Sequence, residues 1–183
     1  MAQVENITPE QSIQSNLADW CFEVGTEHEG HTRRNAEEFA GYMKGNKVVD
    51  LGSGDGAANG GFPQNVEITA VDINQEKLDK NTAKHKICKD FVSYLESVDS
   101  IDNLFMNHTL EHTVEYAKVL ELLNKKVKGT VLIAVPSNDH VHSSHHVAFG
   151  SIDEITLSDF KKIVAEEREV DNITEYIFIG VRK

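Results

Sequence analysis

Two acids frame a glycine-rich segment in the first half of the chain. Asp50 comes two residues before the first glycine of segment 52–56, and Asp72 follows the apolar run Val66 to Val71. A strand, a glycine turn, a second strand and an acid, in this order, are typical of a nucleoside-binding half-fold. Glycines let the backbone approach a ligand, and an acid at the tip of the second strand can accept both hydroxyls of a ribose. The alternative is a loop or hairpin without a ligand, but the combined spacing favours nucleoside binding.

The charge of this segment indicates the kind of nucleoside. Dinucleotide-binding loops usually read GxGxxG, with the third glycine one place later than Gly56, and they hold a pyrophosphate that a negative residue would oppose. Here Asp50 precedes the loop and Asp55 lies within it. Carboxylates suit a ligand that carries positive charge, such as an amino group and a sulfonium. The residues therefore favour S-adenosylmethionine over NAD.

Several segments, in order, resemble one known family. VVDLGSGDG resembles the first motif of the class I S-adenosylmethionine-dependent methyltransferases, and AVDIN resembles that family's second-strand acid. IDNLFMNHTLEH (101–112) is similar to the fourth-strand segment of the small-molecule, type 11/12-like branch, and KGTVLIAVPSND (128–139) to its fifth strand. The resemblance covers roughly Arg33 to the C-terminus.

This resemblance implies S-adenosylmethionine as the cofactor and methyl transfer to an O or N atom of a small-molecule acceptor. It places the loop backbone beside the methionine and ribose, with Asp50 and the main chain of Asn107 near the methionine amino group. It assigns the ribose hydroxyls to Asp72 and the adenine amino group to Asp90. The implied cofactor-binding residues are Asp50, Gly52, Ser53, Gly54, Gly56, Asp72, Ile73, Asp90 and Asn107.

Histidines after the fourth and fifth strands are candidates for acid–base chemistry, because histidine titrates near neutrality. We expect His108 to line the cofactor or acceptor pocket. Three hypotheses compete for segment 138–149: an acceptor-side base, a divalent-metal site or a solvated loop. We expect the solvated loop for His140 and His142, whereas an active-site role stays open for the two later histidines. The catalytic candidates are His146, His145 and His108.

Segment 108–112 also fits H-x-x-E-H, the pattern of inverted zinc peptidases. That chemistry needs both histidines in one helix and a further carboxylate, whereas this segment is expected to span a strand end and a helix cap. Segment 107–110 also lacks the (Asn/Asp)-Pro-Pro-Tyr of amino-directed DNA and glutamine methyltransferases. We therefore predict no metal site and a small-molecule acceptor.

Composition narrows the class of protein further. The chain has 183 residues, enough for one domain with a core, and its net charge of −12 disfavours nucleic acid as a partner. No apolar run approaches the roughly 20 residues that span a bilayer, and no signal-peptide pattern opens the chain. Cys21 and Cys88 lie far apart without metal-type spacing. We expect a cytoplasmic protein with no membrane partner; the oligomeric state is not indicated.

The elements that position these residues alternate between strands and helices. The predicted strands are Val48–Val49, Val66–Val71, Ile87–Asp90, Asp102–Met106, Thr130–Val135, Arg168–Asn172 and Thr174–Val181. The predicted helices run from Thr8 past Trp20, over Thr32–Lys44, after Asn74, after Thr113 and over Thr156–Glu166. This order predicts a Rossmann-like, doubly wound α/β fold. Its seven-stranded sheet is mostly parallel, with one antiparallel strand in a C-terminal hairpin.

Residues 1–31 are expected to form an N-terminal helix followed by segment 22–31, for which two hypotheses stay open: a lid over the cofactor or an ordinary surface connection. Residues 32–183 are expected to form a single domain. Segment 57–63 departs from the fold, because two glycines and a proline disfavour the helix that should follow the glycine loop. We predict one turn or an irregular loop there. This break keeps a second hypothesis open, a non-catalytic module that binds S-adenosylmethionine or a nucleoside. An NAD-linked Rossmann protein is less favoured.

Overall fold

The computed structural model describes residues 2–18, 27–138, 144–170 and 173–183. Trp20, Cys21, His140, His142 and residues 22–26 of the expected lid lie outside the described residues, so the predictions for them stay predictions.

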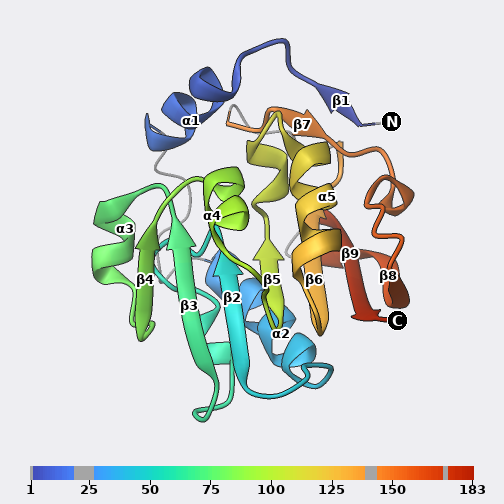
Figure 1. Cartoon of the computed structure of the whole chain (residues 1–183). Coiled ribbons are helices and arrows are strands. Elements are labelled where there is room, and N and C mark those ends of the chain that lie inside the picture. The colour runs from blue at the N-terminus through green and yellow to red at the C-terminus, as the bar shows by residue number, and fades with distance from the viewer. Residues whose placement is uncertain (1, 19–26, 139–143, 171–172) are drawn as a thin grey trace.

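Seven strands form one sheet in the order β4-β3-β2-β5-β6-β9-β8 (Figure 1). Only β9 runs antiparallel to its neighbours on both sides, and all other pairs in the sheet are parallel. The strands are β2 (Lys47–Leu51), β3 (Glu67–Asp72), β4 (His85–Cys88), β5 (Leu104–Asn107), β6 (Thr130–Pro136), β8 (Phe160–Val170) and β9 (Ile173–Arg182). The predicted doubly wound α/β sheet with its C-terminal hairpin is confirmed.

Helices cover both faces of this sheet (Figure 1). One apolar cluster joins α4 and α5 to the strands, and a second joins α2 and α3 to the opposite face. Every residue of β6 is buried, as the apolar sequence of a central parallel strand predicts. The helices are α1 (Pro9–Ala18), α2 (Glu27–Ala40), α3 (Gln75–Lys80), α4 (Phe91–Ser97) and α5 (Tyr116–Lys126). Short 3-10 turns are η1 (Asn59–Gly61), η2 (Leu110–His112) and η4 (Ile152–Glu154).

Local capping explains where two helices begin. The Thr8 hydroxyl accepts from the backbone N–H of Gln11 at 3.2 Å, while the Gln11 side chain accepts from the Thr8 N–H at 2.8 Å. This reciprocal pair is a capping box, and Pro9 occupies the first helical position that it favours. The Asn74 side chain accepts from the Lys77 N–H at 3.1 Å and starts α3. Both starts agree with the sequence patterns.

Three predicted elements are wrong or misplaced. The helix expected over Thr156–Glu166 is absent from this described stretch, which instead contains a short connection after η4 and most of β8. The second helix begins at Glu27, five residues before the expected Thr32, and ends at Ala40. The third strand ends at Cys88, and Asp90 caps the unexpected helix α4. The single turn η1 after the glycine loop matches the prediction of one turn there.

The N-terminal segment lies at the end of the molecule toward which the parallel strands point (Figure 1). Its strand β1 (Gln3–Val4) pairs with β7 (Val147–Ala148) in a small second sheet. From α1, the side chains of Ser12 and Asn16 donate to the His112 carbonyl at 2.9 and 2.7 Å. These contacts place the N-terminal segment over the strand ends. None of the helices that the structure describes combines the length and hydrophobicity needed to cross a bilayer.

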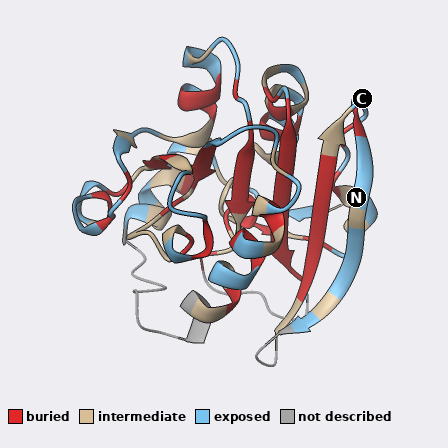
Figure 2. Cartoon of the chain, turned by 90° about the horizontal axis from the view of Figure 1, so that it is seen from below, coloured by how far each residue is buried: buried red, intermediate tan, exposed pale blue. Residues whose placement is uncertain are grey.

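Burial falls off toward the C-terminal edge of the sheet. The inner strands are buried, whereas β8 is mostly exposed along its length (Figure 2). β8 bonds only to β9 among the described strands, and its register shifts between Lys162 and Val164. The β8 edge carries no predicted functional residue. The predicted residues lie instead at the carboxyl ends of the parallel strands, where sheets of this kind bind ligands.

Candidate functional site

The glycine loop leaves β2 in a conformation that only glycine adopts easily. Gly52, Gly54 and Gly56 have φ values of 81°, 51° and 99°. The Gly52 N–H donates to the Val71 carbonyl at 2.8 Å. A Cβ at Gly52 would lie 2.2 Å from the Thr109 methyl carbon. The loop is therefore bonded to the end of β3 and packed against the turn that follows β5.

Asp72 organises the loop from the tip of β3. Its two carboxylate oxygens accept from the backbone N–H groups of Gly54 and Asn74, each at 2.8 Å. Burial raises the pKa of Asp72, while the hydrogen bonds from Asn74 and Gly54 act in the opposite direction. The predicted ribose acid thus joins the glycine loop to the start of α3, and each oxygen keeps a second lone pair for a ligand.

Asp50 is a buried acid without full compensation. It is 3% exposed, and its Oδ2 has no hydrogen-bond partner within the described part of the chain. Burial, and to a lesser extent the negative charge of Asp72, raise the pKa of Asp50 to about 7. The Ser53 hydroxyl is also buried without a partner among these residues. Such orphaned polar atoms are costly, so this corner fits a ligand that carries donors or positive charge.

The remaining predicted cofactor residues lie around the same strand ends. Ile73 is half-buried directly after β3, and the Asp90 side chain accepts from the Ser93 N–H at 2.9 Å as the cap of α4. Asn107, at the end of β5, accepts from the Asn35 side chain at 2.8 Å. Sequence reasoning missed Asn81, whose side chain donates to the Gly54 carbonyl at 3.1 Å.

His108 occupies a strained position just after β5. It is the one non-glycine residue with positive φ, 48°, among the described residues. Its Nε2 lies 2.8 Å from Oε2 of Glu175, which is 1% exposed and also accepts from Asn35 at 3.4 Å. Burial lowers the pKa of His108, but the Glu175 hydrogen bond and the charges of Glu111 and Glu175 outweigh burial and raise it. The ring lies 5.0 Å from that of His31, between centroids.

His145 and His146 lie beside the turn η2, because the His146 N–H donates to the Glu111 carbonyl at 2.8 Å. His146 is 4% exposed, and its Nδ1 lies 2.6 Å from Oε2 of Glu5 in the N-terminal segment. Its Nε2 is buried with no hydrogen-bond partner in the described chain. His145 Nε2 lies 4.0 Å from Oε1 of Glu111. The structure therefore places His145 beside the Glu111 carboxylate, pairs the His146 imidazole with Glu5 and pairs His108 with Glu175.

Glu111 is the central residue that sequence reasoning did not assign. It is 0% exposed, and neither carboxylate oxygen has a hydrogen bond of ordinary geometry among the described residues. Burial raises the pKa of Glu111 to about 7, while the positive charge of His108 and backbone groups of Glu111 and Thr109 lower it in part. The signal for this acid was the H-x-x-E-H spacing. Glu175 gave no signal, because its burial follows from the position of β9.

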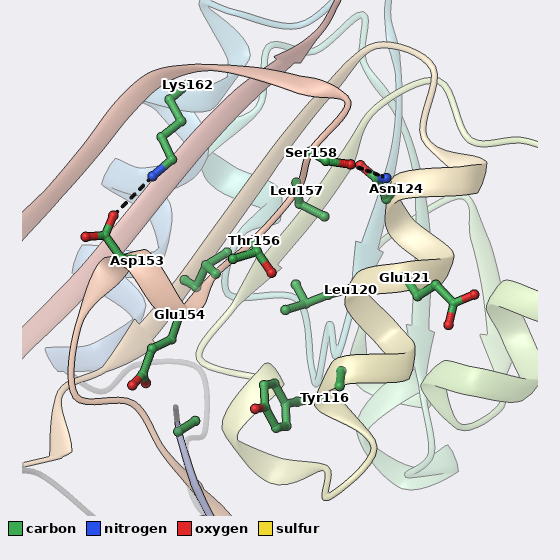
Figure 3. A pocket seen from close by; sticks show the side chains of 13 residues that line it. Tyr116, Leu120, Glu121, Asn124, Asp153, Glu154, Thr156, Leu157, Ser158 and Lys162 are labelled. Atoms are coloured by element: carbon green, nitrogen blue, oxygen red, sulfur yellow. Dashed lines mark hydrogen bonds and ion pairs between the residues drawn. The ribbon is translucent and has the colours of Figure 1, made fainter.

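A separate pocket lies between α5 and segment 153–158 (Figure 3). Its wall includes Tyr116, Leu120 and Asn124 from α5, with Asp153 and Leu157 opposite. None of the predicted site residues lines this pocket. The glycine loop and the histidines therefore remain the candidate functional site.

Solved structures share this fold. A SAM-dependent methyltransferase from Archaeoglobus fulgidus superposes with a TM-score of 0.60 at 18% identity, over 86% of this chain and 95% of that one. 1,6-Didemethyltoxoflavin N1-methyltransferase from Burkholderia thailandensis gives 0.67 at 16% identity, over 99% and 93%. The N-methyltransferase NodS from Bradyrhizobium japonicum WM9 gives 0.73 at 8% identity, over 94% and 97%. No protein-family model and no curated protein matches the chain.

These comparisons define the class of fold. The chain has the fold of the class I S-adenosylmethionine-dependent methyltransferases, with the strand order and C-terminal hairpin described above.

Proposed function

We propose that this protein transfers a methyl group from S-adenosylmethionine to an O or N atom of a small molecule. The observation that carries the proposal is the loop 52–56 with three positive-φ glycines, held by Asp72 and flanked by the uncompensated Asp50. Glycine backbone can approach a ligand closely, and the buried Asp50, one of whose oxygens has no hydrogen-bond partner among the described residues, favours a ligand that brings donors or positive charge. The fold of methyltransferases supports the same reading.

The residues around the loop would hold the cofactor, which supplies an electrophilic methyl group when bound. Asp72 would accept the ribose hydroxyls through its remaining lone pairs, and Asp50 would face the amino group of the methionine moiety. Backbone of Gly52, Ser53, Gly54 and Gly56 would line the cofactor, with Ile73, Asp90 and Asn107 completing its surroundings.

His146 is the best-placed base for an acceptor that must lose a proton. The short contact between its Nδ1 and Glu5 would keep the proton on Nδ1. The lone pair of the buried Nε2 could then take a proton from a hydroxyl or ammonium group. His108, bonded to Glu175, would position the end of β5. His145 is the third predicted catalytic candidate. Alignment of the acceptor with the methyl group remains the main task of these residues.

A second candidate function is supported by one observation. Where related folds need a helix after the glycine loop, this chain has only the three-residue turn η1. A looser pocket there would suit a module that binds the cofactor or a nucleoside without catalysis.

Thermal unfolding with separate additions of S-adenosylhomocysteine, S-adenosylmethionine and NAD tests the cofactor class. A ligand at a hundredfold its dissociation constant stabilises the folded state by about 2.7 kcal/mol, which raises Tm by roughly 5–10 °C for a chain of this length. We expect this rise with the two adenosyl compounds and none with NAD. A rise with NAD alone would overturn the proposal. If the adenosyl compounds raise Tm, turnover in an acceptor screen would distinguish the enzyme from the non-catalytic binding module.

A further inference from the structure

We propose that Glu111, His112 and His145 form a binding site for one divalent transition-metal ion of the zinc type. Their candidate ligand atoms all lie within 4.8 Å of one another. The inference goes beyond methyl transfer and does not depend on it, since it concerns the ion alone.

The buried carboxylate is the first argument for a cation here. Glu111 is 0% exposed, and neither of its oxygens has a hydrogen bond of ordinary geometry among the described residues. Burying a carboxylate is expensive unless a cation or donors compensate it. Folded proteins rarely leave both oxygens of an acid in this state. A metal ion between the carboxylate and the two imidazoles would supply the missing compensation.

The orientation of His112 is the second argument. Its Nδ1 lies 3.0 Å from the Ser144 carbonyl oxygen, an acceptor that fixes the proton on Nδ1. Its Nε2 is therefore the unprotonated nitrogen, and it lies 3.8 Å from Oε1 of Glu111. Metal-binding histidines commonly donate their other ring N–H to a backbone carbonyl in this way.

The position of His145 completes the trio. Its Nε2 lies 4.0 Å from the same Glu111 oxygen, and its ring stands edge-on to that of His112 at 4.9 Å between centroids. In a tetrahedral zinc site with ligand bonds of about 2.0–2.2 Å, neighbouring ligand atoms lie about 3.3–3.5 Å apart. The two separations from Glu111 exceed that by about half an ångström, a difference that small side-chain rotations can close.

A neighbouring trio explains why the ion is assigned to Glu111. His31, His108 and Glu175 also lie within 4.8 Å of one another. There, however, Glu175 is already compensated by the 2.8 Å contact with His108 and by the Asn35 side chain. These bonds hold the pKa of Glu175 below its ordinary value although burial opposes them. A cation has less to gain at Glu175 than at Glu111.

The donor set indicates the kind of ion. Two imidazoles and one carboxylate suit zinc, cobalt, iron or nickel, whereas magnesium and calcium prefer oxygen ligands alone. Three protein ligands also leave at least one coordination position for water or another oxygen ligand.

The test is a titration of tag-free, chelator-treated protein with Zn²⁺ and, separately, with Co²⁺ as an absorbing probe. We expect one equivalent to bind with micromolar or tighter affinity and to raise Tm. Glu111→Gln and His145→Gln should each weaken binding by at least about 100-fold, more than loss of an outer-shell partner does. The matched control is His85→Gln, which alters an exposed histidine 3.0 Å from Glu67.

Three results would overturn the proposal. The first is that wild-type protein does not bind one equivalent of the ion at micromolar concentration. The second is that Glu111→Gln and His145→Gln bind the ion like wild type, and the third is that His85→Gln loses it. Unfolding curves recorded in chelator identify any variant that does not fold. If Glu111→Gln is such a variant, His145→Gln carries the test.

Discussion

Asp50 shows at the scale of one residue how burial and ligand binding are connected. Its place before the glycines could be recognised from the sequence, because acid and glycines are adjacent in the chain. Its raised pKa could not, since that depends on burial and on Asp72, which follows 22 residues later in the chain. The same limit applies to Glu111 and Glu175, whose burial is set by turns and strands distant in sequence.

The protonation of Asp50 predicts a pH-dependent stability. Its pKa rises from 3.8 to about 7 on folding. The native state therefore holds a proton that the unfolded chain has lost, and stability falls as pH rises from about 4 to about 7. At pH 8 Asp50 is ionised in both states, and burying its charge lowers the free energy of unfolding by at most about 4 kcal/mol, at 1.36 kcal/mol per pKa unit. Asp50→Asn should therefore raise the Tm of ligand-free protein at pH 8 but not at pH 4.

Denaturation curves of wild type and Asp50→Asn between pH 4 and pH 8 measure this difference. Asp99→Asn, at an exposed position, serves as the control and should match wild type. Parallel curves for wild type and Asp50→Asn across this range would contradict the account of Asp50.

At the scale of elements, the glycine loop was predictable and the C-terminal edge was not. The segment 156–166 contains Leu157, Phe160 and Val164 at helical spacing, together with two lysines and a glutamate that favour helices. In the structure, ten-residue pairing with β9 outweighs this local preference. Charged residues along an exposed edge strand also discourage further pairing, which explains a helix-like composition in β8.

Gly45 and Gly52 have similar positive φ values, so alanine substitutions at these two positions distinguish steric crowding from backbone strain. Gly52 has φ of 81° and a Cβ there would meet Thr109 at 2.2 Å, whereas Gly45 has φ of 77° with open space around it. Gly45→Ala should cost about 1 kcal/mol from the positive φ alone. Gly52→Ala should cost about 3 kcal/mol, because the clash adds to the strain. Urea denaturation measures both values, and equal losses would show that the loop does not pack on the turn after β5.

At the scale of the whole molecule, the alternation of strands and helices predicted the architecture, and the N-terminal helix was expected, but the pairing of β1 with β7 was not predicted. β1 and β7 are two residues each and pair across more than 140 positions. No periodicity can reveal such short elements. This distant pairing nevertheless brings Glu5 to His146 and α1 to the turn η2.

The N-terminal segment should detach when its polar contacts are removed. Ser12 and Asn16 both donate to the His112 carbonyl, and Ser12 is 2% exposed. The double variant Ser12→Ala, Asn16→Ala should expose the first 18 residues to limited proteolysis at least about fivefold faster, since each lost bond costs about 1 kcal/mol. Gln14→Ala, at an exposed position of the same helix, should be cleaved like wild type. Equal cleavage of all three proteins would refute this docking.

The most direct test of the central claim is calorimetric titration of S-adenosylhomocysteine into wild type, Asp72→Asn and the control Asp99→Asn. We expect one equivalent to bind wild type and the control alike. Asp72→Asn should bind at least about tenfold more weakly, a loss of about 1.4 kcal/mol, because the ribose acceptor and the loop's anchor are both altered. Absence of binding to folded wild type, or unchanged affinity in Asp72→Asn, would contradict the assignment of this site.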